Sequence, residues 1–327
     1  MNLPEKTGYL CRTPCRCQDQ SGDREKPRGC GAAPARHRVS PGRRPSRTGR
    51  FRYNGPVMPR EPIESRTLWR VQEGGTRELS DWVVVEEPLE IRVQGESLAV
   101  IMRTPGHDLE LATGFCLTEG VVKSIDAIGT IRQCRSDDDG ELNVVEVSLA
   151  PGIAFDHERL RRNMMTSAAC GLCGRASLEA LATQATPSRS SLRVRREVLQ
   201  ALPERLLRAQ ESFGRTGALH ASGLFDAEGQ LRVCREDVGR HNAVDKVVGR
   251  AALDSLATDD AILLVSGRTS FEILQKAAVA GIPVVCAVSG PTTLAIETAR
   301  AFNITLINFL RGQGMNIASR PERVITP

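Results

Sequence analysis

Long hydrophobic runs are missing from this 327-residue sequence, and aromatic residues make up only 4% of it. No apolar run approaches eighteen residues, so we expect no helix that spans a membrane and no membrane partner. The first residues also lack the apolar core of a signal peptide, which favours a soluble protein of the cytosol. In that reducing compartment we expect the ten cysteines to be free thiols rather than a disulfide framework.

The part of the chain after residue 60 is not basic, although the formal net charge of the whole chain is +5. Residues 1–60 carry 14 lysines and arginines against 4 acidic residues, whereas the rest of the chain carries 30 against 35. A protein that binds nucleic acid should have a basic face on its folded part. The charge pattern therefore predicts no nucleic-acid partner.

The sequence divides into a leader and two predicted domains. Residues 1–60 are rich in Arg, Pro, Gly and Ser without apolar periodicity, which is typical of a disordered basic leader. Because Met58 stands just before the first structured-looking stretch, we hypothesise that translation starts there and that the leader is not translated. We expect a small α+β domain over residues 61–165 and an α/β domain over residues 166–327.

The first domain should be mainly β-structure. The pattern becomes β-like from Trp69, and residues 94–96 (Gln-Gly-Glu) predict a hairpin turn. We expect Asp108 to cap a helix that ends near Gly120. Two further strands are predicted over residues 128–133 and 142–149. In the second domain we expect a helix over residues 194–213 that breaks at Pro203, and a hairpin over residues 217–235.

The last seventy residues predict a parallel sheet. Continuous apolar runs at 261–265, 283–288 and 304–309 alternate with helical patterns, as in sheets buried on both faces. In such sheets ligands bind beyond the carboxyl ends of the strands. All three runs end in loops with glycine and hydroxyl or arginine side chains, which suit phosphates. Neither GxGxxG nor GxxxxGK(S/T) occurs, so this is no standard nucleotide fingerprint. The site residues that we predict there are Ser266, Arg268 and Thr269.

Cys170 and Cys173 form a CxxC pair in a glycine-flanked stretch. The helical pattern that follows, with Ser177 as its candidate N-cap, places the pair just before or in the first turn of a helix. The amides and dipole at a helix start favour the thiolate, which is the nucleophilic form.

Other interpretations of the pair are two buried small side chains, or half of a zinc site. No second pair of ligands has suitable spacing and no His-x-Glu precedes the pair, so we expect no metal. Thiol chemistry remains, and spacing alone leaves both disulfide exchange and persulfide carriage open.

Residues 235–246 (Arg-Glu-Asp-Val-Gly-Arg-His-Asn-Ala-Val-Asp-Lys) concentrate ionisable side chains around Gly239. The segment opens a predicted helix at about Asn242. We hypothesise that its charges bind a ligand or tune a thiol, and the alternative is a salt-bridged helix start.

With these motifs in view, the chain resembles the FdhD family, the formate dehydrogenase accessory sulfurtransferases, over roughly residues 80–325. The resemblance rests on the following segments: Met102-Arg-Thr-Pro-Gly, Gly114-Phe-Cys-Leu-Thr-Glu-Gly120, Ser167-Ala-Ala-Cys-Gly-Leu-Cys-Gly174, the charge-rich segment 235–246, Ser266-Gly-Arg-Thr-Ser270 and Asn308-Phe-Leu-Arg-Gly.

The resemblance implies a sulfur carrier. Such proteins accept persulfide sulfur from a cysteine desulfurase and pass it to the bis-(molybdopterin guanine dinucleotide) molybdenum cofactor, which formate dehydrogenase requires. The persulfide would form on Cys170, with Cys173 assisting. The resemblance also implies a homodimer and a cytidine-deaminase-like α/β/α domain. The cofactor segment that it implies consists of Phe309, Leu310, Arg311, Gly312, Gln313 and Gly314.

Two rival functions remain at this stage. A thiol-disulfide oxidoreductase would use the same cysteine pair and would form a reversible disulfide without sulfane sulfur. A non-catalytic chaperone for the cofactor would dispense with Cys170 and Cys173 but would need Arg311.

Overall fold

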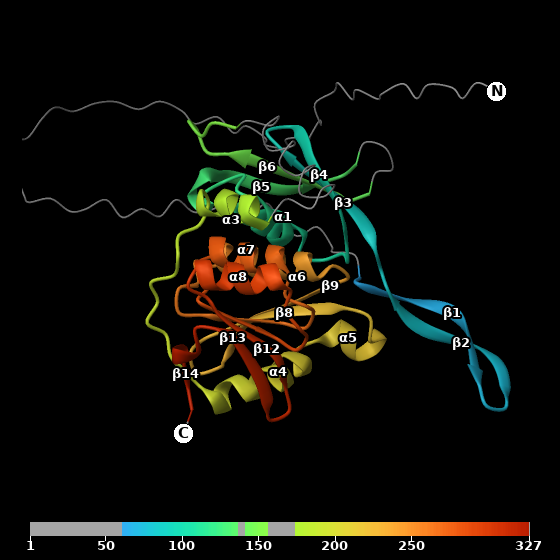
Figure 1. Ribbon diagram of the computed structural model, residues 1–327. Coiled ribbons are helices and arrows are strands. Elements are labelled where there is room, and N and C mark those ends of the chain that lie inside the picture. The colour runs from blue at the N-terminus through green and yellow to red at the C-terminus, as the bar shows by residue number, and fades with distance from the viewer. Residues whose placement is uncertain (1–60, 137–140, 156–173, 327) are drawn as a thin grey trace, which may run out of the picture. The chain divides into compact units, whose positions relative to one another are not determined.

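The computed structural model describes residues 61–136, 141–155 and 174–326, and its larger sheet has six strands (Figure 1). The strand order is β13-β12-β11-β10-β8-β9. The three central strands are parallel to one another, as predicted from their apolar runs: β10 (Ile262–Val265), β11 (Val284–Ala287) and β12 (Thr305–Arg311). The outer strands are antiparallel to their neighbours: β8 (His220–Phe225), β9 (Leu231–Asp237) and β13 (Gly314–Ser319).

Helices cover both faces of this sheet, which gives three layers (Figure 1). One apolar core lies against α3 (Gly174–Ala182), α6 (Arg240–Leu253), α7 (Phe271–Val279) and α8 (Thr293–Ala301). The second core lies against α4 (Arg196–Arg208). Strands buried between two cores need apolar residues at every position, and β10 and β11 are fully buried over their whole lengths.

The smaller sheet has the order β4-β3-β6-β5 and packs with one helix. Its elements are β3 (Glu87–Val93), β4 (Glu96–Arg103), α1 (Asp108–Thr118), the 3-10 turn η1 (Ile125–Ala127), β5 (Ile128–Cys134) and β6 (Val144–Leu149). The hairpin turn predicted at residues 94–96 joins β3 to β4.

A separate two-stranded ribbon precedes this sheet (Figure 1). It consists of β1 (Ile63–Gln72) and β2 (Gly75–Val84), paired in continuous antiparallel register. The remaining elements are β7 (Val194–Arg195), α5 (Glu211–Thr216), η2 (Pro321–Arg323) and β14 (Val324–Ile325), and β7 pairs with β14.

Two glycines allow α1 to lie directly against α6. A Cβ atom on Gly114 would lie 1.9 Å from the carbonyl oxygen of Asp245, and one on Gly249 would lie 1.8 Å from the carbonyl oxygen of Glu110. Any larger side chain at either position would push the helices apart. The small sheet and the large sheet are therefore joined by a close helix-to-helix contact.

Several local predictions were wrong. The β-pattern begins at Ile63 rather than Trp69. The helix predicted to open at about Asn242 begins at Arg240, within the usual uncertainty of a helix end. Asp108 does not cap α1, because its carboxylate accepts hydrogen bonds from Arg103, and the N-cap is His107.

The helix predicted over residues 194–213 also differs. It runs through Pro203 and ends at Arg208. The proline costs about 3 kcal/mol in a helix interior, but leucines on both sides of it are buried in the second core and offset that cost. Ser177 lies inside α3, which begins at Gly174, and is therefore not its N-cap. Among the described residues, no helix is both long and apolar enough to cross a membrane.

Candidate functional site

The loops that follow the parallel strands meet at one edge of the large sheet, as predicted. Thr269 connects them: its N–H donates to the carbonyl oxygen of Gly290 (3.2 Å), and its own carbonyl accepts from the N–H of Thr292 (3.0 Å). Asn308 in β12 donates from Nδ2 to Oγ1 of Thr269 (2.9 Å) and to the carbonyl of Ser289 (3.2 Å). The three segments therefore form one hydrogen-bonded surface.

Asn308 also carries an unused acceptor. Its side chain is buried, with 1% exposed, yet Oδ1 has no hydrogen-bond partner within the part of the chain that the structure describes. An unpaired buried amide oxygen costs free energy unless something binds it. This atom marks the edge as a place where a donor from outside the described residues would be stabilised.

The segment implied as cofactor-binding, residues 309–314, is a β-hairpin. Phe309 has a left-handed backbone (φ 51°), is 40% exposed, and lies so close to Gly290 that a Cβ there would be 2.8 Å from the ring. The Arg311 guanidinium lies 5.8 Å from the centre of the same ring. Gly312 makes the turn with φ 55°, and the carbonyl of Gln313 accepts from Gln200 in α4 (2.7 Å).

These residues do not all face the same way. Leu310 is fully buried in the second core, so its side chain supports the hairpin rather than facing the edge. Gly314 begins β13 on the returning strand. An exposed aromatic ring and an arginine remain available, and both suit a ligand that carries bases and phosphates.

At the other end of the same edge, Ser266 lies beside His220. The Ser266 hydroxyl accepts from the N–H of Ala221 (3.0 Å) and lies 3.5 Å from Nδ1 of His220. Arg268 is exposed. A Cβ on Gly267 would lie 3.4 Å from both His220 and the Arg240 side chain, so these two side chains meet at the loop after β10.

His220 was missed by sequence reasoning. It opens β8, and its pairing with Asp237 places it at the carboxyl edge of the parallel strands. Burial and the neighbouring Arg240 lower the pKa of its imidazole. The signal that could have found it is the hairpin register, because an antiparallel neighbour begins where the parallel strands end.

Arg240 and His241 form the first turn of α6 at this edge. The Nε atom of Arg240 is buried and has no partner among the described residues. His241 lies with Nε2 3.4 Å from the Ser270 hydroxyl. Burial, and secondly Arg240, lower the pKa of His241 to about 4, so its imidazole is neutral at pH 7.

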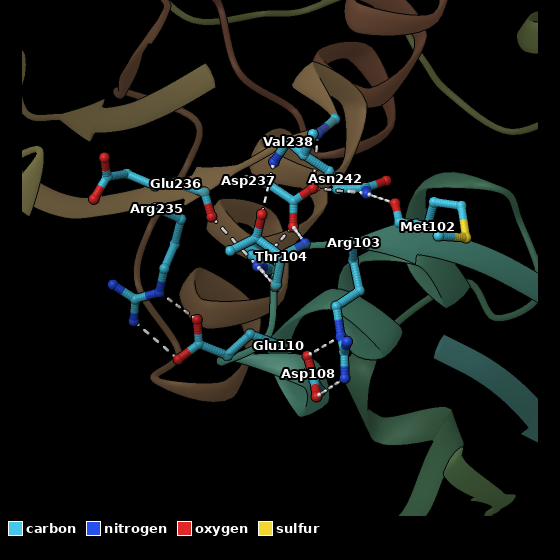
Figure 2. Close-up of polar contacts among 12 residues, drawn as sticks. Met102, Arg103, Thr104, Asp108, Glu110, Arg235, Glu236, Asp237, Val238 and Asn242 are labelled. Carbon is cyan, nitrogen blue, oxygen red and sulfur yellow. Dashed lines mark hydrogen bonds and ion pairs between the residues drawn. The ribbon is translucent and has the colours of Figure 1, made fainter. Parts of the chain in front are cut away.

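The charges of Arg235 and Asp237 are directed toward α1 and the small sheet, against the hypothesis that the whole segment 235–246 binds a ligand (Figure 2). Arg235 forms two bonds to Glu110 of α1, at 2.5 and 2.9 Å. Asp237, which is fully buried, accepts from the N–H of Thr104 (3.2 Å) and pairs with Lys246 (2.7 Å). The alternative of a salt-bridged helix start is therefore confirmed for these residues.

A second buried network joins α1, α6 and α7. Lys276 contacts Asp245 (2.9 Å), Glu119 (2.6 Å) and the hydroxyl of Thr118 (3.0 Å). Burial raises the pKa of Asp245 to about 6, although Lys276 opposes that shift. Asp245 is thus part of the junction between the helices rather than of the edge.

The predicted thiol chemistry of the CxxC pair stays a prediction. Cys170 and Cys173 lie outside the described residues, and the described helix α3 begins at the residue after Cys173. Burial raises the pKa of the Cys116 and Cys234 thiols to about 12 and also raises that of Cys286. These thiols are protonated at neutral pH and are poor nucleophiles. No cluster of His, Cys, Asp or Glu suited to a metal occurs among the described residues.

The geometry defines a class of protein: a three-layer α/β fold. The segments that follow its three parallel strands meet at one edge of the sheet, which is where such folds bind ligands. Residues 84–325 match the model of the FdhD/NarQ family. The chain is 48% identical over 271 residues to a protein named sulfur carrier protein FdhD from Streptomyces avermitilis, which covers 80% of this chain and 95% of that one. It is 46% identical over 251 residues to the protein of that name from Mycobacterium tuberculosis, covering 74% and 91% of the two chains.

A solved structure has the same fold. A crystal structure described as a formate dehydrogenase accessory protein from Desulfotalea psychrophila superposes with a TM-score of 0.65 at 24% identity, covering 81% of this chain and all of that one. The protein described here belongs to the FdhD/NarQ family.

Proposed function

We propose that this chain is a sulfur carrier that takes persulfide sulfur from a cysteine desulfurase and passes it to the bis-(molybdopterin guanine dinucleotide) molybdenum cofactor for formate dehydrogenase. It would act in the cytoplasm as a homodimer. Membership of the FdhD/NarQ family supports the carrier role. The single structural observation that carries the proposal is the edge at which the loops after β10 and β11 join the β12–β13 hairpin.

Cys170 is the proposed carrier atom. Its thiolate attacks the terminal sulfur of the desulfurase persulfide, a new sulfur–sulfur bond forms, and the desulfurase cysteine leaves as a thiolate. No net oxidant is needed, because the sulfane sulfur keeps its oxidation state. Burial raises the thiol pKa of Cys116, Cys234 and Cys286, which makes these three described cysteines poor candidates for the carrier.

Cys173 is proposed to release the sulfur. Its thiolate attacks the Cys170 sulfur, so a Cys170–Cys173 disulfide forms and the outer sulfur departs as sulfide with the bonding electron pair. The two cysteines are oxidised by two electrons while the sulfane sulfur is reduced by two. A cellular dithiol must then reduce the disulfide before the next cycle.

The molybdenum cofactor is the acceptor substrate in this proposal, and the donor set of the edge suits it. Its phosphates match the half-buried Ser266 hydroxyl and the exposed guanidinium groups of Arg268 and Arg311, whereas the fully buried Thr269 would hold the loops in place. The exposed Phe309 ring offers a face on which a base can stack. The cytidine-deaminase-like arrangement of the larger sheet also belongs to this proposal, and its three layers support it.

The test is intact-protein mass spectrometry after incubation with a cysteine desulfurase and cysteine. Wild type is expected to gain one sulfur, Cys170→Ala none, and Cys234→Ala one, because the Cys234 thiol is protonated. A sulfur gain that survives in Cys170→Ala would refute the role of Cys170. Because the proposed release step itself leaves a disulfide, a wild-type disulfide favours the thiol-disulfide oxidoreductase only if Cys173→Ala also gains no sulfur. No change in any protein, with cofactor binding lost in Arg311→Ala, would favour the cofactor chaperone.

A further inference from the structure

An arginine and a histidine from different elements meet at the loop after β10. Nδ1 of His220, at the start of β8, lies 3.5 Å from the Ser266 hydroxyl in this loop. A Cβ on Gly267 would lie 3.4 Å from the same Nδ1 atom and 3.4 Å from Cδ of Arg240, in the first turn of α6. The guanidinium-bearing side chain and the imidazole are therefore held together beside a strand-end loop.

Arg240 has no counter-charge of its own within the described ranges. It forms no ion pair there, and its Nε atom is buried without a hydrogen-bond partner. The nearby Asp237 carboxylate is fully buried and already pairs with Lys246 (2.7 Å). Glu272 is half exposed and lies 3.9 Å from His241 instead. Because an unpaired buried donor costs free energy, an anion from outside the described residues would be stabilised at Arg240.

This position is separate from the hairpin that bears Phe309 and Arg311. The strand order places β11 and β10 between β12 and β8. Neighbouring strands lie about 4.8 Å apart, so β12 and β8 are about 14 Å apart across the edge. Two places for anions at this separation suit a ligand with two charged arms. The acceptor of the proposed function has two nucleotide arms, each with a pyrophosphate, whereas a single compact phosphate would fill only one place.

We propose that Arg240 and His220 form a second anion subsite at this edge, which binds a phosphate group of the acceptor while His220 takes up a proton. The guanidinium fork matches two phosphate oxygens, and the half-buried Ser266 and exposed Arg268 lie in the adjoining loop. The first turn of α6 carries no acidic residue that would repel the ligand. The inference deepens the proposed function and rests on it for the identity of the acceptor.

The proton uptake follows from the charges that face His220. Burial, and secondly Arg240, lower the pKa of its imidazole below the ordinary value of 6.5, whereas Asp237 opposes that shift. A phosphate bound at Arg240 offsets the repulsion. At about 5 Å and an effective dielectric constant of about 20, one negative charge raises a neighbouring pKa by about two units. On binding, the imidazole therefore takes a proton from solvent and donates a hydrogen bond to a phosphate oxygen.

His241 is expected to stay neutral at pH 7 even in the complex. Burial, and secondly Arg240, lower its pKa to about 4, so an increase of about two units leaves it below neutral pH. The other charged groups around this imidazole are Glu272, Lys276 and Glu119. Its Nε2 atom lies 3.4 Å from the Ser270 hydroxyl, where it braces the loop after β10. A proton taken up at pH 7 therefore identifies His220.

The first test is calorimetry of the full chain with diguanosine pyrophosphate, in buffers of different ionisation enthalpy. The phosphates of this probe are diesters, so they hold no proton that titrates near neutral pH, unlike monoesters with a second pKa of about 6. Wild type is expected to take up about half a proton per bound ligand at pH 7. By linkage, its affinity should fall about threefold for each unit of pH between pH 6 and pH 8, as His220 becomes harder to protonate.

Four variants separate the parts of the subsite. His220→Gln should bind without proton uptake and with an affinity that no longer changes with pH, whereas His241→Gln should keep the uptake. Arg240→Gln should bind about 30-fold more weakly, because a hydrogen-bonded charge pair is lost. The matched control is Arg250→Gln, which removes the same charge near the other end of α6 and should leave both affinity and uptake unchanged.

The second test measures the imidazole itself, and it serves if His220→Gln or Arg240→Gln fails to fold. The full chain has five histidines, so selective labelling gives few NMR signals to assign, and His220 is identified by substituting the other four in turn. Its titration midpoint is expected to rise by about one to two units when the dinucleotide is added. The midpoint of an exposed histidine such as His107 should not move.

Four results would overturn the proposal: no binding by wild type, binding without proton uptake, uptake that survives in a folded His220→Gln protein, or full affinity in a folded Arg240→Gln protein. Sulfur loading is measured on the same proteins, and His220→Gln is expected to gain one sulfur as wild type does. Loss of loading in His220→Gln alone would place His220 in the carrier step instead. If no protein takes up sulfur, the proposed function fails while the binding result stands.

Discussion

Asp237→Asn is the substitution for which the structure makes the sharpest energetic prediction. The Asp237 carboxylate is fully buried and accepts from the N–H groups of Thr104 and Gly239 and from the side chain of Asn242. It also pairs with Lys246, which is 1% exposed. Asparagine has nearly the same shape but no charge, so the substitution leaves a buried ammonium group without its counter-charge.

The expected cost is large because removing one partner of a buried ion pair leaves the other uncompensated. Such losses are about 3–5 kcal/mol, a large part of a total stability of about 5–15 kcal/mol. Lys246 keeps its bonds to the carbonyls of Thr104 and Glu236, which favours the lower half of this range. We therefore expect a loss of about 3–4 kcal/mol.

The assay is urea unfolding at pH 7, followed by circular dichroism and fluorescence. A double variant, Asp237→Asn with Lys246→Met, should recover about 2 kcal/mol of the loss, because no unpaired charge remains. The control is Glu64→Gln in the exposed pair with Arg66, which should change stability by less than about 0.5 kcal/mol. An Asp237→Asn protein within 1 kcal/mol of wild type would refute the reasoning.

The remaining predictions address the helix contact, pH and the site. Gly249→Ala should cost at least about 3 kcal/mol in urea unfolding, since its Cβ would overlap the Glu110 carbonyl, whereas Gly214→Ala, with open space around it, should cost less than 1 kcal/mol. Although burial opposes the shift, Arg235 and secondly His107 lower the pKa of Glu110 to about 2, against 4.5 in the unfolded chain. The ionised Glu110 therefore contributes roughly 3 kcal/mol of stability, which is present above pH 4.5 and lost as the pH falls toward 2. An acid titration of stability that is no flatter in Glu110→Gln would contradict this. Cys173→Ala should accumulate persulfide at Cys170 and release less sulfide than wild type in a methylene blue assay, and equal release would exclude Cys173 from that step. Arg311→Ala should weaken binding of a guanine dinucleotide about tenfold in calorimetry without changing sulfur loading, and unaltered affinity would remove Arg311 from the site.

The regular part of the fold could be predicted because single local patterns decide it. The apolar runs of β10, β11 and β12 are unbroken, as strands buried on both faces require, and the glycine at residue 95 indicates the turn between β3 and β4. The convergence of the strand-end loops follows from parallel order alone. The sequence therefore predicts that the loops bearing Ser266 and Thr269 lie at one edge, and the structure places both loops there.

The orientation of the charge-rich segment could not be predicted. Arg235 meets Glu110, which is 125 residues away, and Asp237 meets Thr104 across 133 residues. A local pattern shows that charges gather but not which ones find partners from another element. The course of α4 through Pro203 has the same cause, since the core that compensates the proline is built from distant strands.

The charge-rich segment 235–246 links the small sheet to the edge of the large sheet, because Asp237 contacts the small sheet and Arg240 lies at the edge. Asp237 holds the N–H of Gly239 and the side chain of Asn242, and it thereby fixes the start of α6. Arg240 follows directly, with its side chain against Gly267 at the edge. Because the Asp237 carboxylate also accepts a hydrogen bond from the N–H of Thr104, the small sheet helps to determine the position of the first turn of α6. A substitution at Thr104 should therefore disturb ligand binding at an edge that it does not touch, by moving Arg240 rather than by removing a contact.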